Sequence, residues 1–141
     1  EQDDESGRRI RQLLGGSGHE VVSYRIVRDE PALIRDHILL LLTDPKVDAV
    51  LMNGGTGIAP RDTTFEAIRS LLQKEIEGFG ELFRMLSYEA IGPAAMLSRA
   101  VAGISSGKVL ISMPGSTAAV ELAMEKLVIP ELGHMLHLLE G

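Results

Sequence analysis

The feature that most constrains the fold is a short apolar strand that runs directly into a glycine-rich turn. Residues 48–52 (DAVLM) are almost wholly apolar, which is typical of a strand covered on both faces by helices. The next five residues, Asn53-Gly54-Gly55-Thr56-Gly57, are called here the glycine loop. A second apolar strand, at 108–113 (KVLISM), runs into Pro114-Gly115-Ser116, the proline turn. Because ligands of parallel α/β sheets bind beyond the carboxyl ends of the strands, the two turns are predicted to converge on one site.

Helical patterns alternate with these strands along the rest of the chain. Apolar residues recur at i, i+3, i+4 and i+7 within 79–86, and a β-branched run at 19–27 (HEVVSYRIV) predicts one more strand. Helices are expected at 6–14 with Ser6 as the cap, at 31–42, from Thr63 or Thr64 to 73 with a Thr63/Glu66 capping box, around 79–86, after Gly92-Pro93 as far as Arg99, at 117–127 and from Pro130 onward. This alternation predicts an α/β fold, a three-layer αβα sandwich with a mostly parallel sheet, in one domain spanning 1–141.

Composition narrows the classes of partner. The chain has 141 residues, of which 45% are hydrophobic, enough for a core without cross-links. The formal net charge of -6 disfavours nucleic acid and anionic membranes as partners, although local backbone dipoles can still hold a small anion. The absence of cysteine excludes disulfides, thiolate metal sites and cysteine nucleophiles. No segment is apolar for long enough to span a bilayer, and we expect a cytoplasmic protein.

The glycine loop has the chemistry of a phosphate cradle without a familiar nucleotide signature. It lacks the Lys-Ser/Thr of a P-loop and does not read GxGxxG. Glycines nevertheless let backbone N–H groups turn toward an oxyanion, and Thr56 adds a hydroxyl donor. The alternative is a tight turn without a ligand. The proline turn offers a helix N-terminus and the Ser116 hydroxyl to a phosphate, although a helix cap explains Ser116 equally well.

Two aspartates follow predicted strands and would suit a magnesium ion. Asp62 comes shortly after the glycine loop and Asp29 after the β-branched strand, and Mg²⁺ prefers carboxylate and water oxygens. Each aspartate could instead cap the helix that follows it. Glu81 lies off the apolar stripe of its helix, as a solvated charge or as a site residue. His134 and His137, at i and i+3 near the chain end, are expected to face solvent rather than bind a metal.

Three segments together resemble a known family. GGTGIAPRDTT at 54–64, GFGELFRMLSYEAIGPAAMLSRAVAG at 78–103 and MPGS at 113–116 closely resemble the MoaB/MogA family of molybdenum cofactor biosynthesis proteins, which includes the G domain of gephyrin. The similarity runs from Asp4 to the last helix, and the CinA-like proteins are less similar. It implies the molybdopterin-binding fold, a homotrimer or hexamer, and Mg²⁺-dependent adenylylation of molybdopterin by ATP with release of pyrophosphate. A molybdenum-insertion enzyme would be the partner that uses the product.

The resemblance also implies roles for individual residues. Asp29 and Asp62 match acidic residues expected to bind magnesium and to act in catalysis beside the triphosphate. The residues matched to cofactor and substrate binding are Ser6, Gly7, Gly54, Gly55, Thr56, Gly57, Glu81, Ser98, Arg99, Pro114, Gly115 and Ser116. Glu81, with Ser98 and Arg99 nearby, falls on the pterin side.

The sequence departs from the family pattern at several positions. Asn53 stands where Thr is usual, and Pro is frequent where this chain has Arg28, Phe65 and Thr117. Family members begin with a strand and a Val-Ser-Asp turn, both of which this sequence is expected to lack. Because some members are duplicated within one organism, a second hypothesis stays open: a molybdopterin-binding or scaffold protein with little catalytic activity.

Overall fold

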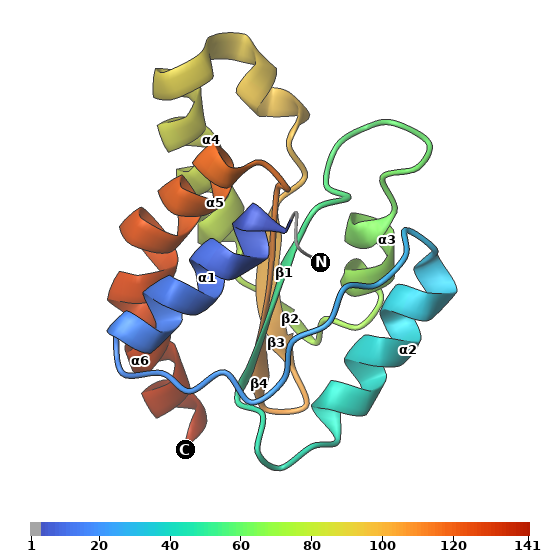
Figure 1. The fold of residues 1–141 in the computed structure, drawn as a ribbon, viewed down its shortest axis with the longest axis vertical. Coiled ribbons are helices and arrows are strands. Elements are labelled where there is room, and N and C mark those ends of the chain that lie inside the picture. The colour runs from blue at the N-terminus through green and yellow to red at the C-terminus, as the bar shows by residue number, and fades with distance from the viewer. Residues whose placement is uncertain (1–3) are drawn as a thin grey trace.

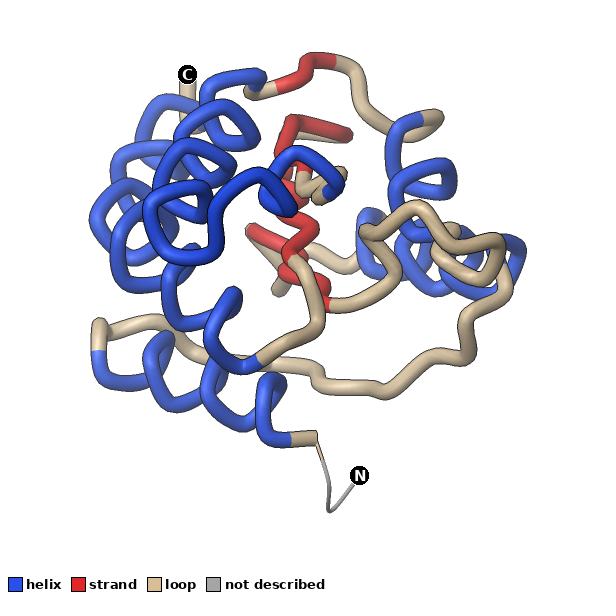
Figure 2. Tube along the Cα trace, turned by 90° about the horizontal axis from the view of Figure 1, so that it is seen from above, coloured by secondary structure: helices blue, strands red, loops and turns tan. Residues whose placement is uncertain are grey.

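The computed structural model describes residues 4–141 as one sheet with helices on both faces. The elements are α1 (Glu5–Gly16), α2 (Pro31–Leu42), β1 (Ala49–Asn53), α3 (Thr64–Arg69), β2 (Lys74–Glu75), α4 (Glu77–Ile91), η1 (Gly92–Leu97), β3 (Val101–Ser105), β4 (Lys108–Met113), α5 (Thr117–Ala123), η2 (Met124–Val128) and α6 (Ile129–Leu139). α1, α4, α5 and α6 lie on one side of the sheet, and α2 and α3 on the other (Figure 1). Figure 2 shows the same three layers from above. The predicted αβα sandwich is confirmed.

The sheet is mixed, with strand order β1-β4-β3-β2. β1 and β4 are parallel, whereas β4 pairs with β3 and β3 with β2 in antiparallel fashion. In the described part of the chain, the parallel arrangement expected from the sequence therefore holds for one of three strand pairs. The difference arises because β3 and β4 form a hairpin through Ser106 and Gly107, whose φ values of 54° and 74° suit a two-residue turn.

Each face of the sheet carries its own core, and β4 contributes to both. Val109, Ile111 and Met113 pack in the cluster under α1, α4, α5 and α6, whereas Leu110 packs in the cluster under α2 and α3. All four side chains have no exposed surface. Burying one such side chain stabilises a fold by about 1.5–3 kcal/mol. β4 is therefore a firmly anchored strand, and it fixes the position of the proline turn that follows it.

The strand predicted at 19–27 is wrong. The segment connects α1 to α2 and pairs with no strand among the described residues. Residues of this segment and of β1 line a common cavity of about 740 Å³. Its side chains are largely exposed, Ile26 to 55%. Tyr24 ties it to α1, because its hydroxyl donates to Asp4 and its ring centroid lies 3.9 Å from the Arg11 guanidinium. β-branched residues favour extended backbone, but a strand also needs a partner edge within hydrogen-bond reach.

The helix predictions are mostly confirmed, with shifted ends. Asp4, rather than Ser6, caps α1: its carboxylate accepts a hydrogen bond from the Gly7 N–H at 2.9 Å. α3 ends at Arg69 rather than near residue 73, because residues 74–75 join the sheet as β2. The helix predicted at 117–127 is α5 followed by the π-helical turn η2. No helix in residues 4–141 is long and apolar enough to cross a membrane.

Candidate functional site

The carboxyl ends of β1 and β4 bring the glycine loop and the proline turn together. Asn53 and Met113 are the last paired residues of these two parallel strands. The Gly54 N–H donates a hydrogen bond to the Met113 carbonyl at 2.9 Å. A Cβ placed on Gly115 would lie only 3.3 Å from the Gly54 Cα, so the two backbones are almost in contact. The predicted convergence of the two turns is confirmed.

The backbone of the glycine loop itself requires glycine. Gly54 and Gly55 have φ values of 103° and 69°, in a backbone region that residues other than glycine rarely adopt. A Cβ on Gly55 would also lie 2.1 Å from the Thr64 Oγ1. Thr64 sits that close because its N–H donates to the Gly55 carbonyl at 3.1 Å. The turn geometry alone thus explains both glycines, and their contact with a ligand stays a prediction.

Asp62 closes the loop on itself rather than capping α3. Its carboxylate accepts a hydrogen bond from the Ala59 N–H at 3.0 Å, and its own N–H donates to the Ala59 carbonyl at 2.9 Å. The same carboxylate packs against Gly57, where a Cβ would lie 2.7 Å from Oδ2. The cap residue of α3 is Thr63, which makes no side-chain cap bond. The Thr63/Glu66 capping box is therefore wrong, and so is the alternative that Asp62 is a cap.

Asp29 lies exposed in the turn before α2 and lines the 740 Å³ cavity together with Gly54. Asp62 borders a second hollow, of about 400 Å³, which Pro31 also lines. The two aspartates thus border different hollows that approach each other at the start of α2. Among the described residues, no group of three or more His, Asp or Glu side chains could hold a metal ion. A magnesium ion here would need water and substrate oxygens for most of its coordination, and this role stays a prediction.

Arg99 lies behind the glycine loop and binds its carbonyl groups. Its backbone N–H donates to the Thr56 carbonyl at 2.8 Å and its Nε to the Gly57 carbonyl at 2.9 Å. Its Nη2 donates to the Asp62 carbonyl at 2.9 Å, and the guanidinium forms an ion pair with Glu66. The hydrogen bond from Arg99 holds the pKa of the Glu66 carboxyl below its ordinary value. The guanidinium predicted to bind a ligand is therefore engaged with the protein.

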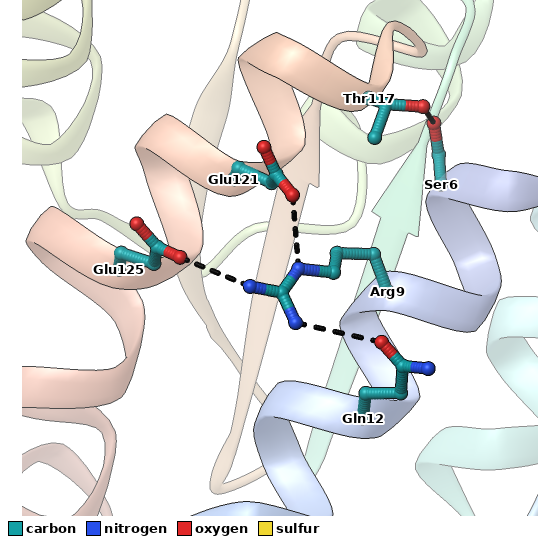
Figure 3. Close-up of polar contacts among 6 residues, drawn as sticks. All are labelled: Ser6, Arg9, Gln12, Thr117, Glu121 and Glu125. Atoms are coloured by element: carbon teal, nitrogen blue, oxygen red, sulfur yellow. Dashed lines mark hydrogen bonds and ion pairs between the residues drawn. The ribbon is translucent and has the colours of Figure 1, made fainter.

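α1 is held against the proline turn and the helix that follows it (Figure 3). The Ser6 hydroxyl donates to the Gly115 carbonyl at 2.6 Å. One turn further along α1, Arg9 forms ion pairs with Glu121 at 2.9 Å and Glu125 at 3.2 Å. Ser6 is thus brought to the site as predicted, but its hydroxyl proton is already donated to the backbone of the proline turn.

Two further predicted binding residues, Ser116 and Gly7, contribute to the ends of helices α5 and α1. The Ser116 Oγ accepts a hydrogen bond from the Ala119 N–H at 3.2 Å and caps α5, as the cap alternative expected. Gly7 provides the space for Asp4, since a Cβ there would lie 2.1 Å from the Asp4 carboxylate. These contacts leave ligand binding at both positions as a prediction.

The other candidates lie outside the meeting point of the turns. Glu81 is exposed on α4 and lines neither hollow. The Ser98 carbonyl accepts a hydrogen bond from Arg84 at 3.2 Å. His134 is paired with Glu131 at 2.9 Å and exposed, so the expectation that it faces solvent is confirmed. The apolar stripe at 79–86 is confirmed in part: Phe79 and Phe83 are buried, whereas Leu82 is exposed.

Sequence reasoning did not foresee the contacts by which Asp4 and Arg99 hold backbone groups of the site. Asp4 is not among the predicted site residues, and the family resemblance places Arg99 on the pterin side rather than against backbone carbonyl groups. The hairpin of β3 and β4 did have a signal, because Ser106-Gly107 separates two short apolar runs, VAGIS and KVLIS. For Arg99 the available signal was one cation within the otherwise small and apolar stretch SRAVAG.

Known proteins resemble this chain over nearly its whole length. The family described as a probable molybdopterin binding domain matches residues 1–134. Molybdenum cofactor biosynthesis protein B of Halalkalibacterium halodurans is 55% identical over 134 residues, which cover 94% of this chain and 79% of that protein. A crystal structure of a protein of the same name superposes with a TM-score of 0.96 at 54% identity, over 99% of this chain and 88% of that one.

A more distant structure extends the similarity. The tungsten cofactor synthesizing protein MoaB from Pyrococcus furiosus is 39% identical and superposes with a TM-score of 0.87, over 100% of this chain and 88% of that one. The MoaB/MogA resemblance and the molybdopterin-binding fold are thus confirmed. The chain belongs to the molybdopterin-binding family of molybdenum cofactor biosynthesis proteins, and its role lies in the biosynthesis of that cofactor.

Proposed function

We propose that this chain adenylylates molybdopterin, using ATP and Mg²⁺ and releasing pyrophosphate. The observation that carries the proposal is the meeting of the glycine loop and the proline turn at the ends of two adjacent parallel strands. Each turn offers backbone N–H groups of the kind that bind phosphate oxygens. Two such turns in contact suit a reaction between two phosphorylated substrates, and the family of the chain supplies molybdopterin as one of them.

The reaction requires positioning and charge neutralisation rather than a covalent intermediate. A phosphate oxygen of molybdopterin attacks the α-phosphorus of ATP, the new P–O bond forms, and the bond to pyrophosphate breaks. Backbone N–H groups of the glycine loop would hold the phosphates of one substrate, and the proline turn those of the other. Holding both in line lowers the entropic part of the barrier, and fixed donors stabilise the charge that moves to the leaving group.

Asp62 and Asp29 are the residues that would hold the magnesium ion. One carboxylate oxygen of Asp62 accepts from the Ala59 N–H, and the other has no hydrogen-bond partner within residues 4–141. Asp29 is exposed at the start of α2. Two carboxylates with the remaining positions filled by water and phosphate oxygens fit the preferences of Mg²⁺. Bound there, the ion would neutralise charge on the triphosphate.

An adenylylation assay tests the proposal. Purified molybdopterin is incubated with the protein, ATP and Mg²⁺, and both adenylylated molybdopterin and pyrophosphate are quantified. We expect stoichiometric formation of both with the wild-type chain, and formation at least about a hundredfold slower with Asp62→Asn. Binding of molybdopterin without either product would refute the enzyme and favour the alternative, a molybdopterin-binding or scaffold protein.

A thermal denaturation experiment separates the same two hypotheses without an activity assay. A ligand that binds only the folded state must raise the melting temperature. We expect Mg²⁺ with ATP to raise the Tm of the wild-type chain, and Asp62→Asn to lose most of the increase. A Tm that responds to molybdopterin but not to Mg²⁺ with ATP would favour the scaffold.

We also infer that the chain forms a homotrimer or hexamer, using the exposed apolar side of α4 and η1. Large apolar side chains gather there and protrude into solvent: Leu82, Met85, Tyr88, Ile91 and Met96. Several large exposed apolar side chains on one helix and the turn that follows it are typical of an interaction site in a folded protein. Light scattering should show an oligomer at micromolar concentration, and Met85→Glu should dissociate it, whereas the matched control Leu138→Glu on α6 should not. A monomeric wild-type chain would contradict the inference. A molybdenum-insertion enzyme as partner and a cytoplasmic location stay predictions.

A further inference from the structure

We propose that Arg99 is a positioning residue that fixes the glycine loop in the conformation that binds an anion. It holds three carbonyl groups of the loop and its continuation, those of Thr56, Gly57 and Asp62, at 2.8–2.9 Å. Its main chain contributes the first of these bonds and its side chain the other two. One residue that follows η1 therefore determines the orientation of peptide groups at the carboxyl end of the glycine loop and in its continuation.

The guanidinium has little capacity left for a ligand. Arg has five N–H donors. Nε is committed to Gly57, Nη2 to both Asp62 and Glu66, and Nη1 to Glu66. Four of the five donors thus face protein acceptors, and 28% of the side chain is exposed. Direct contact with a substrate phosphate would require breaking these bonds, so an indirect role explains the geometry better.

The hydrogen bonds from Arg99 fix the direction of the peptide N–H groups as well as that of the carbonyl groups. In a trans peptide the C=O and the N–H of the same unit point in opposite directions. Because Arg99 binds the carbonyls of residues 56, 57 and 62, the N–H groups of Gly57, Ile58 and Thr63 point away from it. Within residues 4–141 none of these three N–H groups has a hydrogen-bond partner. Arg99 therefore holds three backbone donors turned outward, as an anion site requires.

Glu66 and Phe65 hold the guanidinium in place. The Glu66 carboxylate pairs with both Nη atoms, a bidentate geometry that fixes the plane of the guanidinium. The Phe65 ring lies beside it, with its centroid 5.0 Å from the Arg99 Cζ. Both residues lie in α3, which begins at Thr64, shortly after the loop. The loop is thus held between its own continuation and Arg99, which lies just before β3 at the same edge of the sheet.

Lysine cannot reproduce this arrangement, which makes the conservative variant informative. Its ammonium is a point donor and cannot hold the Gly57 carbonyl, the Asp62 carbonyl and the Glu66 carboxylate in one plane. The test compares Arg99→Ala and Arg99→Lys with Arg9→Ala. Arg9 has a similarly exposed side chain, at 33%, and also forms ion pairs, but with Glu121 and Glu125 rather than with the loop. It controls for a general loss of stability.

The first measurement is independent of any ligand. In ¹⁵N–¹H correlation spectra of the folded proteins, Arg99→Ala and Arg99→Lys should shift the amide resonances of Gly57, Ile58 and Thr63, while Arg9→Ala leaves them in place. Unchanged resonances in either folded Arg99 variant would overturn the proposal, as would equal shifts in Arg9→Ala. If Arg99→Ala does not fold, Arg99→Lys decides the question.

The second measurement rests on the proposed function. Inorganic pyrophosphate with Mg²⁺ is titrated into each protein by calorimetry. Arg99→Ala should weaken binding by about tenfold or more and Arg99→Lys by less, with no change in Arg9→Ala. Equal affinity in wild type and Arg99→Ala would overturn the positioning role. If the wild-type chain does not bind pyrophosphate, the proposed function fails, while the spectra still test the position of the loop.

Discussion

Replacing Gly55 by alanine separates the cost of the turn from the cost of losing a ligand. Gly55 has a φ of 69°, and its missing side chain leaves room for the Thr64 hydroxyl. An added Cβ would lie 2.1 Å from the Thr64 Oγ1, closer than atoms can approach, and 3.1 Å from the Thr64 Cβ, which is an unusually tight contact. Because the Thr64 N–H also donates to the Gly55 carbonyl, Thr64 cannot move away without breaking that bond.

The expected destabilisation has two parts. A left-handed backbone costs a residue other than glycine about 1–2 kcal/mol. Relieving the clash requires a side-chain or backbone shift of the kind that costs about 1–3 kcal/mol in an overpacked core. Gly55→Ala should therefore lower the free energy of unfolding by about 2–5 kcal/mol. Gly54→Ala is the matched control, since Gly54 has a φ of 103° but nothing within 4 Å of an added Cβ, and should show the backbone cost alone.

Urea denaturation of a double-mutant cycle measures the two parts. Thr64→Ala removes the hydroxyl, so Gly55→Ala should cost about 1–3 kcal/mol less in that background, which is a coupling between neighbours. Calorimetric titration with Mg²⁺ and ATP then shows whether the folded Gly55→Ala variant has also lost affinity. A free energy of unfolding equal to that of Gly54→Ala, or no coupling to Thr64, would refute the steric reasoning. Unchanged ligand affinity would show that the loop is a turn only.

The remaining predictions concern single groups at the same edge of the sheet. Asp62→Asn should reduce adenylyl transfer by at least about a hundredfold with little change in the urea midpoint, because an amide oxygen can still accept from the Ala59 N–H; normal turnover would remove Asp62 from catalysis. Ser116→Ala should lower the free energy of unfolding by about 0.5–2 kcal/mol, because α5 loses its helix cap. It should weaken the binding of phosphate ligands by about 0.5–1.5 kcal/mol at most. Urea denaturation and calorimetric titration of the same sample measure the two effects. The Tyr24 hydrogen bond holds the pKa of Asp4 below its ordinary value of 3.8, so that stabilisation is lost as the pH falls through the folded pKa. Asp4→Asn should therefore flatten the pH dependence of the unfolding free energy below about pH 4, and an unchanged slope would contradict this.

The central part of the site could be predicted because its signals are local. The strands that became β1 and β4 are continuous apolar runs, and each is followed at once by residues that break regular structure. These two facts, with the rule that parallel neighbours end at the same edge, place the glycine loop beside the proline turn. The segment at 19–27 has an equally strong local signal, yet it is no strand, because pairing depends on an edge supplied from elsewhere in the fold.

The role of Arg99 could not be predicted for a related reason. Its acceptors are mostly backbone carbonyls, and every residue has one, so the residue types at 56, 57 and 62 carry no trace of the contact. The family resemblance therefore assigns Arg99 to the pterin side of a ligand rather than to the backbone of the glycine loop. The sequence left two interpretations of the glycine loop, a cradle or a tight turn, and the glycines are needed for both. A phosphate cradle differs from a tight turn in one physical respect: another group of the protein must bind the loop carbonyls, so that the loop N–H groups face the ligand. In this chain the residue placed to do so, Arg99, lies more than 40 positions away from the loop, between η1 and β3.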